Sequence, residues 1–263
     1  MSEHAQYTEA TRAGLQRIYG SGFTSPGGQP EMAALLDGLD ITGMEVMDLG
    51  CGLGGDSLLL GGTFGAARVV SVDVDPGNLA VTGKAVAEAG LSGVIFPKLV
   101  EPGRFPFDDA AFDLVHSKAM ICHVDDKEAL FREIHRVLRP GGSFVAADWM
   151  AGDQAELSQS YRDFADDLAT AGLIFFFKTA QTHYAALTSA GFEAVKLRDI
   201  SPDIKNFAEQ QLSMVTGSGR DDLISLLGDA GYAGMLRRSQ ARVDALASGD
   251  LQFQYMKATR GNG

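Results

Sequence analysis

The spacing of hydrophobic and polar positions changes along the chain, and it predicts where strands and helices lie. Short apolar segments recur through the first half of the chain, and each is typical of a buried strand. The expected strands are 45–49, 68–72, 94–99, 112–116 and 143–148. Between them apolar residues recur at helical spacing, most clearly in 127–138. This alternation predicts a parallel sheet with helices on both faces.

The pattern changes after residue 148. Residues 153–190 are expected to be helical, and they include the apolar run 173–177. The remaining expected elements are a sixth strand at 192–197, a helical insertion at 207–246 with glycine breaks at 217–219 and 228–234, and a last strand at 251–259. We expect the last strand to return beside the sixth.

Residues 1–30 are expected to form an N-terminal arm ahead of this core. A helix is predicted at about 8–19. The following segment, 20–28, contains so many glycine, serine and proline residues that it predicts a loop. A helix at 31–39 then leads into the first strand.

The most informative motif is VMDLGCGLGG at 46–55, a strand that runs directly into a glycine-rich turn. Glycines let the backbone turn tightly and come close to a ligand. Asp73 ends the next strand, where a carboxylate can accept hydrogen bonds from ribose hydroxyls. These features predict a nucleotide-type cofactor site. The plainer alternative is a turn that only connects a strand to a helix, and Asp73 argues against it.

Two cofactor classes fit the spacing of the glycines. The dinucleotide pattern G-x-G-x-x-G is matched by Gly50, Gly52 and Gly55. The pattern D-x-G-x-G-x-G of class I S-adenosylmethionine-dependent methyltransferases is matched by Asp48, Gly50, Gly52 and Gly54. The segment LRPGG at 138–142 before a strand, together with the returning last strand, favours the second pattern.

Composition limits the partners. Twenty-two lysine and arginine residues stand against 34 aspartate and glutamate residues, so no basic surface for nucleic acid is expected. No apolar run reaches membrane-spanning length and the first residues do not resemble a signal peptide, so we expect no membrane insertion and a cytoplasmic location. No metal is expected, because no His, Asp and Glu cluster has ligand spacing.

The chain resembles phosphoethanolamine N-methyltransferases and related small-molecule methyltransferases over nearly its whole length. The resemblance rests on Gln6-Tyr7-Thr8, the loop 19–28, the motif 48–55 and the ending YMKAT at 255–259. It implies a Rossmann-like α/β fold whose seven-stranded sheet is mostly parallel with an antiparallel last strand. It also implies one domain, 1–263, with an arm (1–30) over the cofactor, a cofactor-binding core (31–150) and a helical cap (151–190 and 201–250).

The resemblance further implies that S-adenosyl-L-methionine is bound and S-adenosyl-L-homocysteine released. The cofactor-binding positions are then Gln6, Thr24, Ser25, Asp48, Gly50, Gly52, Asp73, Val74 and Ser117. The catalytic pair of the family falls on Tyr7 in the arm and His123 after the fourth strand.

The chain departs from the family at positions that contact the substrate. An aspartate four residues before the histidine is Ala119 here, and the phosphate-holding arginine and tyrosine fall within 174–177. The acidic residue near the adenine is displaced, with Glu101 the nearest. These departures argue against phosphoethanolamine. Two interpretations remain for the cations near the cap, which either form a replacement anion site or are solvated surface charges. These cations are Lys178, Arg237, Arg238 and Arg242.

His123 suits the role of a general base, because an amine acceptor arrives as ammonium and a histidine pKa of about 6.5 allows proton uptake near neutrality. A histidine packed beneath the cap is the alternative. Tyr7 is expected either to bond to His123 and close the site or to anchor the arm. The aromatic run Phe175–Phe177, with Tyr184 and Trp149, offers cation–π contacts to an alkylated amine, although core packing explains most of it.

The sequence therefore favours a methyltransferase acting on a small molecule, with an amine nitrogen as the leading acceptor. An oxygen or sulfur acceptor would use His123 in the same way. The other interpretations are a non-catalytic protein that binds S-adenosylmethionine and a nicotinamide oxidoreductase. The expected assembly is a monomer or a homodimer.

Overall fold

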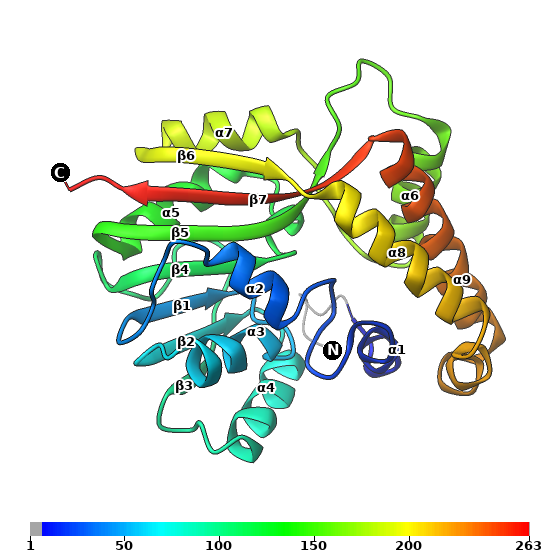
Figure 1. The fold of residues 1–263 in the computed structure, drawn as a ribbon, viewed down its shortest axis with the longest axis horizontal. Helices are drawn as coiled ribbons and strands as arrows, with labels where there is room; N and C mark the ends of the chain where they lie inside the picture. Colours follow the sequence, from blue (N-terminus) through cyan, green and yellow to red (C-terminus); the bar gives the residue numbers. More distant parts are fainter. Residues whose placement is uncertain (1–6, 263) are drawn as a thin grey trace.

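A computed structural model describes residues 7–262 and contains one seven-stranded sheet in the order β3-β2-β1-β4-β5-β7-β6 (Figure 1). The strands are β1 (Glu45–Leu49), β2 (Arg68–Asp73), β3 (Ile95–Leu99), β4 (Phe112–Lys118), β5 (Leu138–Ala151), β6 (Phe192–Asp199) and β7 (Leu251–Arg260). All seven expected strands are confirmed. The pairings from β3 to β5 are parallel, and β7 runs antiparallel to both β5 and β6. The predicted fold class is therefore confirmed.

Helices cover both faces of this sheet. They are α1 (Glu9–Tyr19), α2 (Gln29–Leu35), α3 (Gly55–Leu58), η1 (Leu59–Thr63), α4 (Pro76–Glu88), η2 (Ile121–His123), α5 (Lys127–Val137), α6 (Gln159–Thr170), α7 (Ala180–Ser189), α8 (Ser201–Thr216) and α9 (Arg220–Ser248). One apolar core joins a sheet face to α2, η1, α6, α8 and α9. The other joins the opposite face to α5 and α7. Within residues 7–262, no helix is long and apolar enough to cross a bilayer.

Local sequence explains where several helices begin. The Thr8 side chain accepts a hydrogen bond from the backbone amide of Thr11, which caps α1 at the predicted start. Asp126 caps α5 by accepting from the amide of Ala129 at 2.8 Å. The face of α5 that carries Phe131 and Ile134 is completely buried against the sheet. Capping and apolar spacing thus act together, which is why these two helices were predictable.

The apolar run 173–177 is not helical, and that prediction was wrong. Helix α6 ends at Thr170, Gly172 has a φ of 76°, and α7 starts only at Ala180. The intervening segment is neither helix nor strand, and the backbone amide of Phe176 donates to the carbonyl of Cys122 at 2.7 Å. A long-range backbone contact therefore fixes a conformation that the apolar composition of the run does not specify.

Three further boundaries differ from expectation. Helix α2 spans Gln29–Leu35 and not 31–39, because Pro30 suits its first turn and Gly38 takes a φ of 77° after its end. Helix α8 begins at Ser201, earlier than the expected 207, with a proline in its first turn. Helix α9 continues through the predicted break at 228–234 and kinks only at Gly228.

The helices after β5 gather at one end of the sheet. Helix α9 packs against α6 and α8, and α1 of the arm also packs on α9 (Figure 1). A Cβ atom on Gly14 would lie 3.0 Å from the end of the Met235 side chain, so this glycine lets α1 approach closely. The arm and these helices lie at the carboxyl ends of the parallel strands, the edge at which open α/β sheets bind ligands.

Candidate functional site

The glycine turn joins β1 to α3 at this edge of the sheet. Gly50, Gly52 and Gly54 all have positive φ values, 75°, 55° and 86°. A Cβ atom would lie 2.2 Å from the Met120 side chain at Gly50 and 2.7 Å from that of Thr82 at Gly54. Larger residues are therefore excluded by backbone conformation and by close packing. At Gly52 the nearest atom, the hydroxyl oxygen of Thr24, would be 3.7 Å away, so this position is less crowded.

The loop of the N-terminal arm lies directly on the turn. The amide of Gly55 donates to the carbonyl of Gly22 at 3.1 Å, and Ser25 is buried in the same loop. Helix α1 is tied to the start of α4, where Arg12 pairs with Asp75 at 2.5 Å. Two predicted cofactor positions, Thr24 and Ser25, thus lie in a loop that contacts the turn. A third, Gln6, lies outside the described residues.

Asp73 ends β2 beside the glycine turn. It is 8% exposed, and one carboxylate oxygen accepts from the amide of Gly52 at 2.9 Å. The other accepts from the amide of Asp75 at 2.9 Å and from the Asn78 side chain at 3.4 Å. A carboxylate offers about four acceptor positions, so one remains for a hydroxyl group. Burial raises the pKa of Asp73, although these three hydrogen bonds oppose the change. The partly buried Val74 follows it in the chain.

Asp48 lies below the turn, and both of its carboxylate oxygens already have partners. One accepts from the Ser57 hydroxyl at 2.5 Å, and the other accepts from Nδ1 of His116 at 2.9 Å. All three side chains are buried. Ser117, also buried, donates its hydroxyl to the carbonyl of Leu49 at 2.9 Å. Asp48 and Ser117 therefore fix the ends of β1 and β4, which hold the turn in place.

An ionic cluster that the sequence did not reveal lies beside Asp48. The Lys118 ammonium is 2.8 Å from Asp56 and 3.5 Å from Glu31, and it lies 4.8 Å from the centre of the Phe23 ring. The three charged side chains come from β4, α3 and α2. Burial raises the pKa of Glu31 to about 7, although Lys118 opposes the change. No spacing in the sequence predicts this cluster, because it forms only when α2 lies over the end of β4.

The raised pKa of Glu31 makes stability depend on pH. The folded protein holds this proton more tightly than the unfolded chain, so the free energy of unfolding falls as pH rises from about 4.5 to about 7. The glutamine in Glu31→Gln cannot ionise, so the free energy of unfolding of this variant should lack this pH-dependent decrease. Between pH 5 and pH 7.5, we expect its stability relative to wild type to rise by on the order of 1 kcal/mol in urea unfolding. Glu128→Gln, at an exposed glutamate of α5, is the matched control. An equal pH dependence in wild type and Glu31→Gln would contradict this assignment.

His123 ends η2, just beyond the carboxyl end of β4. Its Nδ1 lies 2.6 Å from the carbonyl oxygen of Ile174, and its ring centre is 4.3 Å from that of Phe175. Because a carbonyl only accepts, Nδ1 carries the hydrogen, and Nε2 of the neutral ring keeps its lone pair. Burial lowers the pKa of His123 and nearby Lys127 acts in the same direction, although the bond to the Ile174 carbonyl opposes the change. The bond to Ile174 leaves Nε2 as the ring nitrogen that can accept a proton.

Two buried side chains that the sequence analysis missed hold this segment. The Asp148 carboxylate accepts from the amides of Ile121 and Cys122 at 2.6 and 3.3 Å, and burial raises the pKa of Asp148 to about 6. The Lys127 ammonium donates to the carbonyls of Ile121 at 2.6 Å and Phe176 at 3.1 Å. Both groups bond to the backbone beside His123. No signal in the sequence pointed to Lys127, because a lysine at the start of an amphipathic helix is normally exposed.

Tyr7 lies near Asp73, at the glycine turn, and near Cys122, beside His123. Burial raises the pKa of its phenol, and the nearby Cys122, Tyr19 and Asp73 act in the same direction. Among the hydrogen bonds of residues 7–262, none joins Tyr7 to His123. The expected bond between the two side chains is therefore not formed in this structure, and its formation during catalysis stays a prediction.

The four cations considered for an anion site all have partners. Lys178 pairs with Asp125 at 2.9 Å. Asp167 pairs with Arg237 at 3.2 Å and with Arg238 at 3.5 Å. Arg242, on α9, donates to the phenol oxygen of Tyr19 and to the side-chain oxygen of Gln211 at 3.1 Å. Only two carboxylates face these four cations, and the partners of Arg242 are uncharged, so the pairings do not neutralise all of the positive charge.

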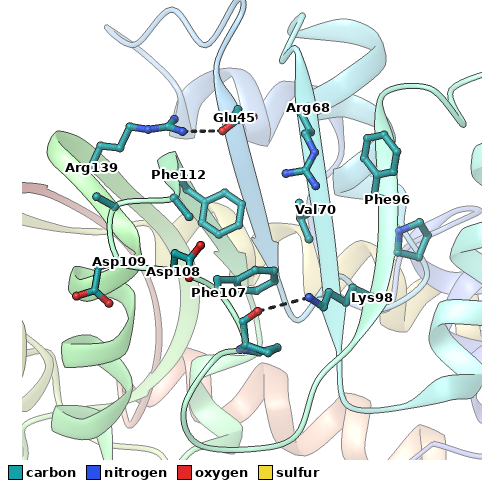
Figure 2. A pocket seen from close by; sticks show the side chains of 14 residues that line it. Glu45, Arg68, Val70, Phe96, Lys98, Phe107, Asp108, Asp109, Phe112 and Arg139 are labelled. Carbon is teal, nitrogen blue, oxygen red and sulfur yellow. Dashed lines mark hydrogen bonds and ion pairs between the residues drawn. The ribbon is translucent and has the colours of Figure 1, made fainter.

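A pocket of about 680 Å³ lies at the amino ends of the parallel strands, opposite the glycine turn (Figure 2). It is bordered by Glu45, Arg68 and Phe112, the first residues of β1, β2 and β4. It forms because residues 100–111, which join β3 to β4, are a loop that leaves the sheet face uncovered. The glycine turn and His123 lie at the other ends of these strands, so this pocket is not the candidate site. Within residues 7–262, no group of three or more His, Cys, Asp or Glu residues could hold a metal ion.

Comparisons with known proteins found a matching family model and relatives of the chain. The family model described as a methyltransferase domain matches residues 47–146. Phosphoethanolamine N-methyltransferase 3 of Arabidopsis thaliana is 25% identical over 98% of the chain and 51% of the relative. Methyltransferase GfsG of Streptomyces halstedii is 30% identical over 76% of the chain and 69% of the relative.

Among solved structures, phosphoethanolamine N-methyltransferase 2 of Haemonchus contortus, in complex with S-adenosyl-L-methionine, superposes with a TM-score of 0.88. It is 22% identical, and the match covers 98% of this chain and 59% of that protein. This likeness confirms the fold. The chain spans about half the length of the plant phosphoethanolamine N-methyltransferases that it matches.

Proposed function

The chain belongs to the class I S-adenosylmethionine-dependent methyltransferases, and on that premise we propose that it methylates an amine nitrogen of a small molecule. The observation that carries this proposal is the position of His123 at the carboxyl edge of the sheet. Its Nδ1 is committed to the Ile174 carbonyl, so Nε2 is the ring atom able to take a proton. The phosphoethanolamine N-methyltransferases among the relatives support an amine acceptor.

The residues around the glycine turn fit the proposed cofactor. S-adenosylmethionine supplies, when bound, a methyl group activated by a positively charged sulfur. The turn leaves space at Gly52, and Asp73 retains an acceptor position for a ribose hydroxyl. We propose that the cofactor is held by Gln6, Thr24, Ser25, Asp48, Gly50, Gly52, Asp73, Val74 and Ser117, with Asp48 and Ser117 acting through the turn that they fix.

The acceptor must reach the reaction with a free lone pair on nitrogen. His123 removes the proton from the ammonium form at Nε2, while the bonds of Lys127 and Asp148 hold the surrounding backbone. Tyr7 and the arm loop cover the turn and keep water away from the reacting groups. Precise positioning of acceptor and donor supplies the rest of the rate enhancement.

The lowered pKa of His123 predicts the pH dependence of turnover. The base is active only when unprotonated, so kcat falls as pH drops through the pKa of His123. Because burial lowers that pKa, the midpoint of the acidic limb is expected below 6.5. The measurement is kcat between pH 5 and pH 8 with both substrates saturating. A midpoint clearly above 6.5 would mean that another group, or the pKa of the amine itself, controls the rate.

A screen of acceptors tests the proposal as a whole. Wild-type protein is incubated with S-adenosylmethionine and separate panels of small amines, phenols and thiols, and release of S-adenosylhomocysteine is measured. We expect release with amines above the level without acceptor. Release only with phenols or thiols would reassign the acceptor atom, and S-adenosylmethionine binding without any release would favour a non-catalytic role. A cytoplasmic location and a monomeric or homodimeric state stay predictions.

A further inference from the structure

A second cavity lies directly beside His123. Its volume is about 190 Å³, and it lies between α6 and the non-helical segment 173–177. All of the lining side chains are apolar, among them Leu168, Phe175 and Phe177. The two phenylalanine rings are stacked on each other with centres 5.1 Å apart. These rings come from the non-helical segment 173–177, and they form one wall of the cavity.

The cavity and the proposed base share their residues. The Phe175 ring lines the cavity and also lies 4.3 Å from the His123 ring, centre to centre. The backbone carbonyl of Ile174, another lining residue, is the partner of His123 Nδ1. Ile174 itself is 54% exposed, an unusual state for a large apolar side chain beside a proposed active site. A group placed in this cavity would contact residues that also contact His123.

The lining of the cavity does not suit a phosphate, because it offers no polar or charged side chain. Lys127, a buried cation that contacts the Phe176 carbonyl, already donates to three backbone carbonyls. Lys178, which follows the lining segment, pairs with Asp125. An anionic group inside the cavity would therefore lose its hydration without gaining a hydrogen-bond donor from the lining, whereas an apolar group gains from burial.

From this geometry we propose that the cavity binds an apolar group of the methyl acceptor, about the size of one six-membered ring. This inference rests on the proposed function, because it assigns the substrate class of the same site. An apolar cavity of about 150 Å³ in another protein binds benzene. The 190 Å³ available here therefore accommodates one ring, with the amine reaching towards His123. The acceptor class is an arylalkyl or cycloalkyl amine and not a phosphorylated amino alcohol.

Direct binding tests this inference without relying on activity. The probes are 2-phenylethylamine and phosphoethanolamine, titrated by calorimetry into the full chain in the presence of S-adenosylhomocysteine. We expect 2-phenylethylamine to bind at least fivefold more tightly. Ala165→Leu, which fills the cavity from α6, should abolish most of that preference. Ala171→Leu, an exposed position just after α6, is the matched control and should leave it unchanged. Thermal unfolding of each variant shows whether the fold is intact.

Methyl transfer to the same two amines separates this inference from the proposed function. One outcome is that 2-phenylethylamine binds, that Ala165→Leu weakens this binding, and that no amine of the acceptor screen is methylated. That outcome would overturn the proposed function and leave the apolar site standing. Methylation of phosphoethanolamine with equal or better kcat/KM would overturn the apolar site and leave the proposed function standing. If Ala165→Leu unfolds, the smaller change Ala165→Val repeats the test. An unchanged preference in a folded cavity-filling variant would also overturn the inference.

Discussion

Replacing His123 with alanine is expected to lower kcat by roughly 10²-fold or more, the range typical of a lost general base. The Nδ1 bond to Ile174 and the lowered pKa present Nε2 as a neutral acceptor, and alanine offers no substitute. Affinity for S-adenosylmethionine should stay near the wild-type value, because the glycine turn and Asp73 do not contact this ring. The measurements are initial rates at saturating substrates and calorimetric titration of the cofactor.

His135→Ala is the control for this experiment. It removes another histidine, on α5, whose ring packs against Phe192 and not near the glycine turn. We expect turnover close to wild type in this variant. Full turnover in His123→Ala at neutral pH would remove His123 from the mechanism. An equal loss in both variants would point to a general loss of structure.

The second large effect is expected at Asp73. Asp73→Ala should weaken S-adenosylmethionine binding at least tenfold, which corresponds to about 1.4 kcal/mol. The substitution removes the proposed ribose acceptor and also frees the amides of Gly52 and Asp75, which the carboxylate now holds at 2.9 Å each. Calorimetry with the purified protein measures the change directly.

Two variants separate ribose binding from support of the turn. Asp73→Asn keeps one oxygen acceptor, so its loss of affinity should be smaller than that of the alanine variant. Asp113→Ala removes a carboxylate that pairs with Arg139 at the opposite edge of the sheet, and the affinity should not change. Unchanged cofactor affinity in Asp73→Ala would exclude the ribose assignment.

The sequence predicted the elements that depend on local patterns. The strands are short apolar segments, α5 combines a cap with an apolar face, and the glycine turn is specified by residues that tolerate positive φ. The run 173–177 carried no such pattern, since five apolar residues in succession fit a buried helix or an extended chain equally well. Its conformation depends on the amide bond of Phe176 to Cys122, between residues far apart in the chain.

The parts of the site that the sequence missed also depend on long-range contacts. Asp48 meets His116 because the two residues are direct partners in the register of β1 and β4. Lys118 meets Glu31 because α2 crosses the end of β4. Lys127 would be placed on the surface by its charge alone, yet it is 3% exposed and bonded to carbonyls. The glycine motif was visible in the sequence, but the residues that support it were not.

The measurement that tests the central claim most directly is transfer of an isotopically labelled methyl group from S-adenosylmethionine to 2-phenylethylamine, followed by mass spectrometry. Wild-type protein should form the N-methylated amine and an equal amount of S-adenosylhomocysteine, and His123→Ala should form little of either. Absence of labelled amine with wild-type protein, across this and the other amines tested, would contradict the account.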